Sequence, residues 1–195
     1  MSPEATPRGT DAMMATPETA WRILETAEEV CSAESVAEEV ARMAREISAR
    51  LRDRHPLVLG VMRGSVIFAG HLLPQLRFPL HFDYLDVTRY GTATVGGHIT
   101  WKVSPGTAVA GRVVLVLDDI LDEGHTLAAV RAKLLAAGAT EFYSAIFAQK
   151  DIGRAKPIAA DFVGITVPNR YVFGFGMDVH GAWRNLPAIY ALRED

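Results

Sequence analysis

The chain has 195 residues, of which 49% are hydrophobic and 22% charged, and its formal net charge is −3. This composition is ordinary for a soluble globular protein and gives no overall attraction to nucleic acid or to an anionic membrane. The single cysteine, Cys31, excludes an intrachain disulfide and a cysteine-based zinc site, which fits a cytoplasmic protein. No apolar run approaches the roughly 18 residues that span a bilayer, and the first residues lack the apolar segment of a signal peptide.

The N-terminal part is predicted to contain a tail and two helices. Residues 1–17 are rich in Pro, Thr, Ser and Ala and are expected to be disordered, which leaves one folded domain over residues 18–195. A first helix is expected over residues 17–30, because Pro17 suits a helix start. A second, long helix is expected to start at Ser35. Its apolar residues recur at helical spacing: Val36, Val40, Met43, Ile47 and Leu51.

Strands and helices then alternate. Residues 56–62 form a continuous apolar run, as expected for a strand covered on both faces, and residues 66–76 are expected to be the helix that follows. Further strand-forming segments are expected at residues 78–90, 99–103, 113–117, 140–150, 161–168 and 170–178. Residues 91–100 contain three glycines and no Asp, Glu, Lys or Arg, which indicates a mobile loop or a hairpin tip. This alternation predicts an α/β fold with a mainly parallel sheet.

Polar residues follow three of the expected strands, at Arg63, at residues 118–126 and at Lys150. Ligands bind beyond the carboxyl ends of the strands in open parallel sheets. We therefore expect these residues to converge on one site.

The segment RVVLVLDDILDEGHTLAAV, residues 112–130, carries the most chemical information. Its apolar strand runs into an acidic turn with Asp118, Asp119 and Asp122, followed by Gly124 and Thr126. Three neighbouring acids repel one another unless a metal ion, hydroxyl groups or backbone N–H groups compensate. A turn that opens a helix binds phosphate through its N–H groups, and carboxylates suit sugar hydroxyls or hydrated Mg²⁺. The pattern therefore indicates a ligand with hydroxyls, a phosphate and magnesium. The alternative, acids that only cap a helix at a solvated strand end, is less favoured.

The same segment, VLVLDDILDEGHT, resembles the phosphoribosyl-pyrophosphate (PRPP) binding signature of the type I phosphoribosyltransferases. Three other stretches narrow the resemblance to the hypoxanthine-guanine phosphoribosyltransferases. VMRGSVIFAGHLL resembles their pyrophosphate loop, DVTRYG the start of their lid, and KPIAADFVGITVPNRYVFGFGMD with WRNLP their purine-binding portion. The similarity covers about residues 30–192. It implies a type I phosphoribosyltransferase-like fold with a small hood subdomain built from the N- and C-terminal segments.

The resemblance also implies roles for individual residues. Asp122 would be the catalytic residue, at purine N7. The PRPP- and phosphate-binding residues would be Arg63, Gly64, Asp118, Asp119, Glu123, Gly124, His125, Thr126 and Arg184. The purine-binding residues would be Lys150 at the exocyclic oxygen, Tyr171 by stacking and Val172 through its backbone. Arg89 and Tyr90 would belong to the lid, and Mg²⁺ would be bound by Asp178, Asp118 and Asp119. Taken singly, Tyr171 could equally be a core residue, and Lys150 and Arg184 could be solvated surface charges.

The sequence departs from the family pattern at four positions. Glu123 stands where many relatives have Thr, so its side chain is expected to point away from the phosphate. His125 and Arg63 replace a frequent Lys, and Arg89 replaces a Ser. These departures bear on PRPP affinity and on the lid. Relatives often have a non-proline cis peptide in the pyrophosphate loop, which makes Met62–Arg63 a candidate.

The resemblance implies an enzyme that transfers the 5-phosphoribosyl group from PRPP to N9 of hypoxanthine or guanine and releases pyrophosphate. It also implies a homodimer or homotetramer with no nucleic-acid or membrane partner. Two alternatives remain open: a PRPP- or nucleotide-sensing RNA-binding regulator on the same fold, or a phosphoribosyltransferase that prefers xanthine or a pyrimidine. The acidic balance disfavours the regulator, because RNA binding needs a basic exposed face.

Overall fold

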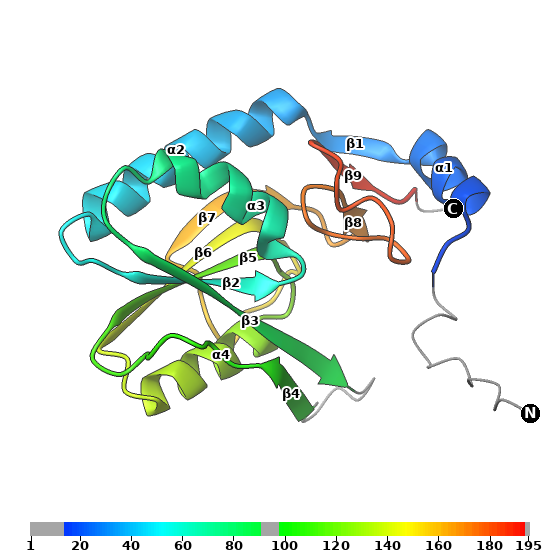
Figure 1. The fold of residues 1–195 in the computed structure, drawn as a ribbon. Coiled ribbons are helices and arrows are strands. Elements are labelled where there is room, and N and C mark those ends of the chain that lie inside the picture. The colour runs from blue at the N-terminus through cyan, green and yellow to red at the C-terminus, as the bar shows by residue number, and fades with distance from the viewer. Residues whose placement is uncertain (1–13, 91–97, 194–195) are drawn as a thin grey trace, which may run out of the picture.

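The computed structural model describes residues 14–90 and 98–193 (Figure 1). The strands of its main sheet are β2 (Leu57–Met62), β3 (His81–Tyr90), β4 (His98–Val103), β5 (Val113–Leu121), β6 (Glu141–Lys150) and β7 (Phe162–Val167). They lie in the order β4-β3-β2-β5-β6-β7. Only the β3–β4 pair is antiparallel; the other neighbouring strands of this sheet are parallel. The predicted α/β fold with a mainly parallel sheet is confirmed.

Helices cover both faces of this sheet (Figure 1). The long helix α2 (Ala33–Leu51), the helix α3 (Ser65–Leu72) and the 3-10 turn η2 (Leu73–Gln75) lie on one face, and α4 (His125–Ala136) lies on the other. The apolar run of β5 is continuous because both faces are buried: Leu115 packs into the core on the α2 side and Val116 into the core on the α4 side.

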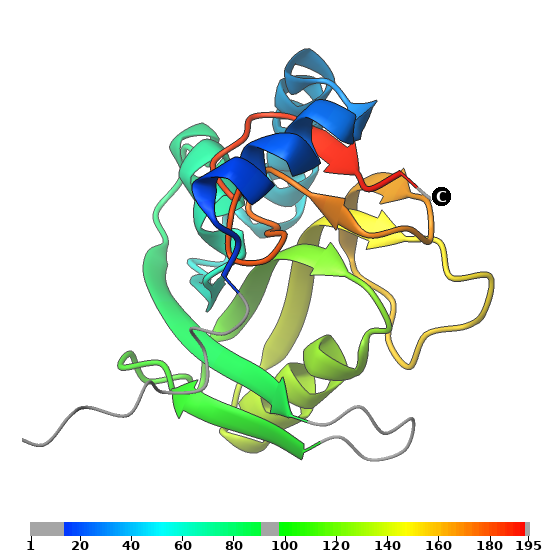
Figure 2. The ribbon, with the colours of Figure 1, turned by 90° about the vertical axis from the view of Figure 1, so that its right-hand side faces the viewer.

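A second, antiparallel sheet forms a hood beyond the end of the main sheet toward which β2 points (Figures 1 and 2). It consists of β1 (Glu28–Cys31), β8 (Val172–Phe173) and β9 (Ile189–Ala191), with β9 in the middle. The hood therefore joins the N- and C-terminal segments, as expected. Val172 and Ile189 belong to the same buried apolar cluster as α2, so the hood and the main sheet share one core.

The helix α1 (Pro17–Thr26) is attached to the C-terminal part of the hood. The rings of Trp21 and Trp183 meet edge to face with their centroids 4.9 Å apart. The indole Nε1 of Trp183 donates to the carbonyl oxygen of Ala20 at 2.8 Å, and the Ala15 N–H donates to the His180 carbonyl at 3.0 Å. This helix thus braces the segment that leads into Arg184.

Several predicted boundaries were wrong. The first helix ends at Thr26, because residues 28–31 leave it to pair with β9. The second begins at Ala33, and Ser32 is its N-cap, accepting from the Ser35 N–H at 3.3 Å. β5 continues through Asp118 and Asp119 to Leu121 because its ladder with β6 continues. Within residues 170–178 only Val172–Phe173 is a strand, and it belongs to the hood.

Most of the predicted tail and of the predicted loop, residues 1–13 and 91–97, lies outside the described residues, so both remain predictions. Across the ranges that are described, no helix has both the length and the apolar character needed to cross a membrane.

Candidate active site

Three neighbouring strand ends define the candidate site. β2, β5 and β6 are adjacent and parallel, so their carboxyl ends lie at the same edge of the main sheet. Arg63 follows β2, Asp122 follows β5 and Lys150 ends β6. The structure thus brings together the polar residues that the strand pattern placed at one edge.

A pocket of about 390 Å³ opens at this edge. Its walls come from the loop after β2, from the segment between Asp118 and Leu127, and from Arg184 of the hood. Every residue expected to bind PRPP lines it: Arg63, Gly64, Asp118, Asp119, Glu123, Gly124, His125, Thr126 and Arg184.

The turn before α4 has the backbone geometry of an anion site. Gly124, the N-cap, has φ 86° in the left-handed region, which favours glycine, and it offers no side-chain hydrogen bond to the first turn of the helix. The first N–H groups of a helix have no partner within the helix and carry the positive end of its dipole. With Thr126 in that first turn, this end of α4 suits a phosphate.

The two adjacent acids of β5 lie in a poorly solvated part of the pocket. Asp119 is 8% exposed and its Oδ1 accepts from the Ile120 N–H at 2.8 Å, while Oδ1 of Asp118 accepts from the Asp119 N–H at 3.0 Å. Burial raises the pKa of Asp118 well above its usual value, and the charge of Asp119 adds to this effect. Burial also raises the pKa of Asp119, against the opposing effects of its hydrogen bond with Asp118 and of the Arg184 charge. Hydroxyl donors or a cation would relieve both carboxylates.

The loop after β2 packs directly on these acids. A Cβ at Gly64 would overlap the carboxyl group of Asp119, and a Cβ at Gly176 of the hood would overlap the carbonyl oxygen of Gly64. The backbone of the loop therefore packs against the Asp119 side chain on one side and against the hood backbone on the other. The Met62–Arg63 peptide within this loop is cis, as predicted.

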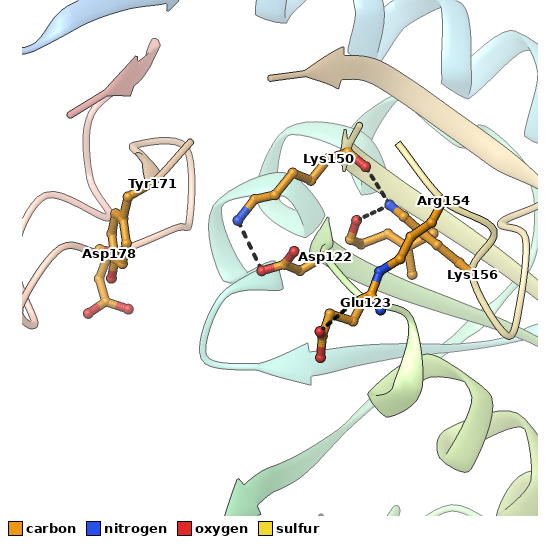
Figure 3. Close-up of polar contacts among 8 residues, drawn as sticks. Asp122, Glu123, Lys150, Arg154, Lys156, Tyr171 and Asp178 are labelled. Carbon is orange, nitrogen blue, oxygen red and sulfur yellow. Dashed lines mark hydrogen bonds and ion pairs between the residues drawn. The ribbon is translucent and has the colours of Figure 1, made fainter. Parts of the chain in front are cut away.

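A second pocket, of about 220 Å³, adjoins the first, because Asp119, Ile120, Asp122 and Arg184 line both. Nζ of Lys150 lies 3.0 Å from Oδ2 of Asp122 and donates to it (Figure 3). Tyr171 and Val172 line the same pocket. Tyr171 is 52% exposed, and its hydroxyl donates to the Asp178 carbonyl oxygen at 3.1 Å. A tethered ring with an open face and a lysine suit a flat heterocycle that carries an acceptor.

Arg184 links the two pockets to the hood. One of its Nη atoms donates to the Gly176 carbonyl oxygen at 2.6 Å, and the other pairs with the Asp178 carboxylate. The second carboxylate oxygen of Asp178 accepts from the Gly181 N–H at 2.8 Å. Burial raises the pKa of the Tyr171 hydroxyl, and the charge of Asp178 adds to the rise.

The three expected metal ligands do not meet at one point. Within the described ranges, no three His, Cys, Asp or Glu side chains form a group that could hold a metal ion. Asp118 and Asp119 lie together in β5 and line the first pocket, whereas Asp178 lines only the second. Two protein carboxylates suit an ion that takes its other oxygen ligands from a substrate and from water.

Glu123 pairs with Arg154 of the β6–β7 loop at 2.9 Å, which offsets its negative charge beside the phosphate turn (Figure 3). Arg89 and Tyr90 end β3, where their backbones pair with Ile99 and His98 of β4. The lid segment that would follow lies outside the described residues.

Two cations were not singled out from the sequence. Arg154 contacts Glu123, and the Lys156 ammonium donates to the carbonyl oxygens of Leu121 and Lys150 (Figure 3). The sequence holds no local signal for these roles, because each contact depends on how the β6–β7 loop folds back over the end of β5.

The chain is similar in sequence and in fold to known proteins. Residues 26–180 match the model of the family described as the phosphoribosyl transferase domain. The hypoxanthine-guanine phosphoribosyltransferase of Bacillus subtilis is 33% identical over 163 residues, 83% of this chain and 91% of that protein. The bifunctional protein TilS/HprT of Listeria innocua is 34% identical over 165 residues, 84% of this chain but only 26% of that protein, so this chain spans about a quarter of it. A solved hypoxanthine-guanine-xanthine phosphoribosyltransferase superposes with a TM-score of 0.79 at 29% identity, covering 87% of this chain and 99% of that one.

Proposed function

The chain belongs to the phosphoribosyltransferase family, and within it to the hypoxanthine-guanine phosphoribosyltransferases, and on that premise we propose that it is a purine-salvage enzyme. It transfers the 5-phosphoribosyl group from PRPP to N9 of hypoxanthine or guanine and forms IMP or GMP with pyrophosphate. The observation that carries the proposal is the pair of adjoining pockets with Asp122 in their common wall. One pocket has the acids and the phosphate turn, and the other has the lysine and the exposed aromatic ring.

In the first pocket, the residues divide the binding of PRPP among them. Backbone N–H groups of residues 123–126 and the Thr126 hydroxyl hold the 5′-phosphate at the start of α4. Asp118 and Asp119 accept hydrogen bonds from the ribose hydroxyls, whose donors offset the cost of burying these carboxylates. Arg63, the Gly64 backbone and Arg184 hold the pyrophosphate, for which guanidinium groups give bidentate contacts.

In the second pocket, the residues read the base. The Lys150 ammonium donates to the oxygen at purine position 6, Tyr171 stacks on the ring, and the Val172 backbone contacts the edge of the base. Asp122 faces N7 and stabilises or takes the proton there as the N9–C1′ bond forms. Lys150 and Asp122 form an ion pair in this structure. A base placed between them replaces that ion pair with two hydrogen bonds, one from Lys150 to its O6 and one between its N7 and Asp122.

Magnesium fits the donors of the first pocket, because Asp118 and Asp119 offer oxygen atoms and their burial favours a neighbouring cation. When bound, Mg²⁺ neutralises the developing charge on the pyrophosphate leaving group. The Asp178 carboxylate is paired with Arg184, so it would have to break that ion pair before it could bind Mg²⁺.

A panel of bases tests the proposal. Purified protein is incubated with PRPP and Mg²⁺ and with hypoxanthine, guanine, xanthine, adenine or uracil, and nucleotide and pyrophosphate are measured. Nucleotide from hypoxanthine and guanine is expected. Product only from xanthine or uracil would reassign the base, and no product, together with retention of RNA on a filter, would favour the RNA-binding regulator.

A further inference from the structure

Lys156 has no part in the reaction as described, yet it lies between the two strand ends that carry the base-contacting groups. Its Nζ donates to the carbonyl oxygen of Leu121 at 2.7 Å and to that of Lys150 at 2.6 Å. Leu121 ends β5 and directly precedes Asp122, while Lys150 ends β6. In Figure 3 the Lys156 ammonium sits at these carbonyls, and the Lys150 side chain extends the other way, toward Asp122.

This contact stands where the hydrogen-bonded ladder between the two strands stops. The last paired residues of β5 and β6 are Leu121 and Gln149. Asp122 and Lys150 therefore lie one residue beyond the pairing that holds β5 to β6. The ammonium of Lys156 continues the connection past that point, through one bond to each strand end.

The Lys156 side chain is well suited to hold this geometry. Hydrogen bonds from an ionised donor are stronger than those between neutral groups. The β6–β7 loop that carries it packs on the phosphate turn: a Cβ at Gly124 would lie 3.4 Å from atoms of Lys156, Pro157 and Ile158. Burial lowers the pKa of Lys156, and the carboxylates of Asp122 and Asp151 act in the opposite direction.

We propose that Lys156 is a positioning residue, which sets the separation of Asp122 and Lys150 and thereby the recognition of the N7 and O6 edge of a 6-oxopurine. The inference rests on the proposed function, since it assigns a means of base selection to that same site. Lys150 is also paired with Val167 of β7, so removal of the Lys156 bonds chiefly frees the end of β5, and with it Asp122, relative to Lys150. A displacement of about 1 Å in a positioned group costs up to roughly 10²-fold in rate, so this freedom impairs base selection without loss of the fold.

Lys156→Met tests this directly, because methionine keeps an unbranched apolar stem and removes the donors. At saturating PRPP, we expect the KM for hypoxanthine and guanine to rise about tenfold and kcat/KM to fall roughly 10- to 100-fold. The Kd for PRPP, titrated separately, should change by less than about threefold. The preference for hypoxanthine over adenine should also fall, because the Lys150 donor distinguishes an oxygen from an amino group at position 6.

Lys102→Met is the matched control. It makes the same lysine-to-methionine change at an exposed position of the edge strand β4, which is not among the residues that line the two pockets. The purine KM of this variant should stay within about twofold of the wild type. Lys156→Gln, which keeps an amide donor, should give a purine KM between those of the wild type and Lys156→Met, and it carries the test if the methionine variant does not fold.

A double-mutant cycle with Lys150→Met separates positioning from a general structural effect. If Lys156 acts through Lys150, adding Lys156→Met to Lys150→Met should cost little more in purine kcat/KM. An unchanged purine KM and adenine discrimination in Lys156→Met, or fully additive losses, would overturn the proposal. A wild-type protein that makes no nucleotide from either base would instead overturn the proposed function.

Discussion

Asp122 lines both pockets and pairs with Lys150. Under the proposed function it acts on the base, so its replacement should affect turnover more than PRPP binding. Asp122→Asn keeps the size of the side chain but removes its capacity to take a proton. Turnover should fall by roughly 10²–10⁴-fold, the usual range for a lost general acid or base, while the Kd for PRPP changes much less. Single-turnover kinetics and PRPP titration measure the two effects.

Thr126→Ala is the companion variant, with the opposite pattern expected, because it removes a hydroxyl from the phosphate turn and should weaken PRPP binding first. Near-normal turnover with lost PRPP affinity in Asp122→Asn would make Asp122 a ribose or metal ligand.

Position 64 requires glycine because of a close contact, not because of its backbone conformation. Its φ of −60° and ψ of −45° suit alanine, but a Cβ there would displace the Asp119 carboxyl group. Gly64→Ala should therefore raise the Kd for PRPP by on the order of tenfold, because the Asp119 carboxylate can no longer keep its place in the pocket. Gly70→Ala in α3 is the control, since a Cβ there meets nothing within 4 Å. Equal effects of the two substitutions on PRPP binding would contradict the role of this contact.

The sequence alone pointed to those site residues whose chemistry is unusual for their position. Three acids and a Gly-x-Thr after a buried strand have few structural explanations, and the structure places them in one pocket. Lys156 was not predicted from the sequence, because nothing distinguishes it from other loop lysines. Only the tertiary fold brings the two carbonyl oxygens that it contacts within reach.

The buried Asp118 carboxylate at the end of β5 lowers the free energy of unfolding, and the size of this effect depends on pH. The pKa of Asp118 is raised in the folded protein, so below the usual carboxyl pKa of 3.8 both states are protonated and the cost is absent. As the pH rises through that value and then through the raised one, the folded state retains a proton that the unfolded chain has lost. The free energy of unfolding therefore falls with rising pH in that window.

Asp118→Asn should remove this cost. At pH 7 we expect a higher free energy of unfolding than in the wild type and a flatter dependence on pH above 3.8, together with weaker PRPP binding. Urea titrations at several pH values measure the effect. A slope identical to that of the wild type would show that Asp118 is not the group responsible.

The element boundaries that the sequence did not predict depend on distant partners. The apolar run of β5 located the start of the strand, but its ladder with β6 extends the strand through two acids. Residues 28–31 carry no strand pattern of their own, and they become a strand because β9 lies alongside them. Local sequence cannot report a partner so far along the chain.

The hood and the main sheet share one buried core, so we expect the whole molecule to unfold as one cooperative unit. Ile189 is fully buried in the apolar cluster that also contains residues of α2. Ile189→Ala should lower the free energy of unfolding by about 3 kcal/mol and leave a single transition. In a Trp101→Phe background, tryptophan fluorescence reports on Trp21 and Trp183 beside the hood, and circular dichroism reports largely on the main sheet and its helices. Two separated midpoints would show that the hood unfolds independently.

The overall architecture was largely predictable from the sequence. Alternating strands and helices indicate a parallel sheet, and such a sheet has its ligand site at the carboxyl ends of the strands. How the hood closes over that site was implied only by family resemblance. Its contacts depend on backbone approaches such as that between Gly176 and Gly64, which no pattern of polarity encodes.

The strand order of the hood also bears on how the protein is made. β9 is the central strand of that sheet and follows every other described helix and strand along the chain. During synthesis β1 leaves the ribosome early and has no partner until β9 emerges, whereas β2, β3, β5 and β6 can already pair. The base-binding side of the site is therefore completed last, and a nascent chain that ends before residue 189 would lack both a closed hood and the part of the shared core that β9 supplies.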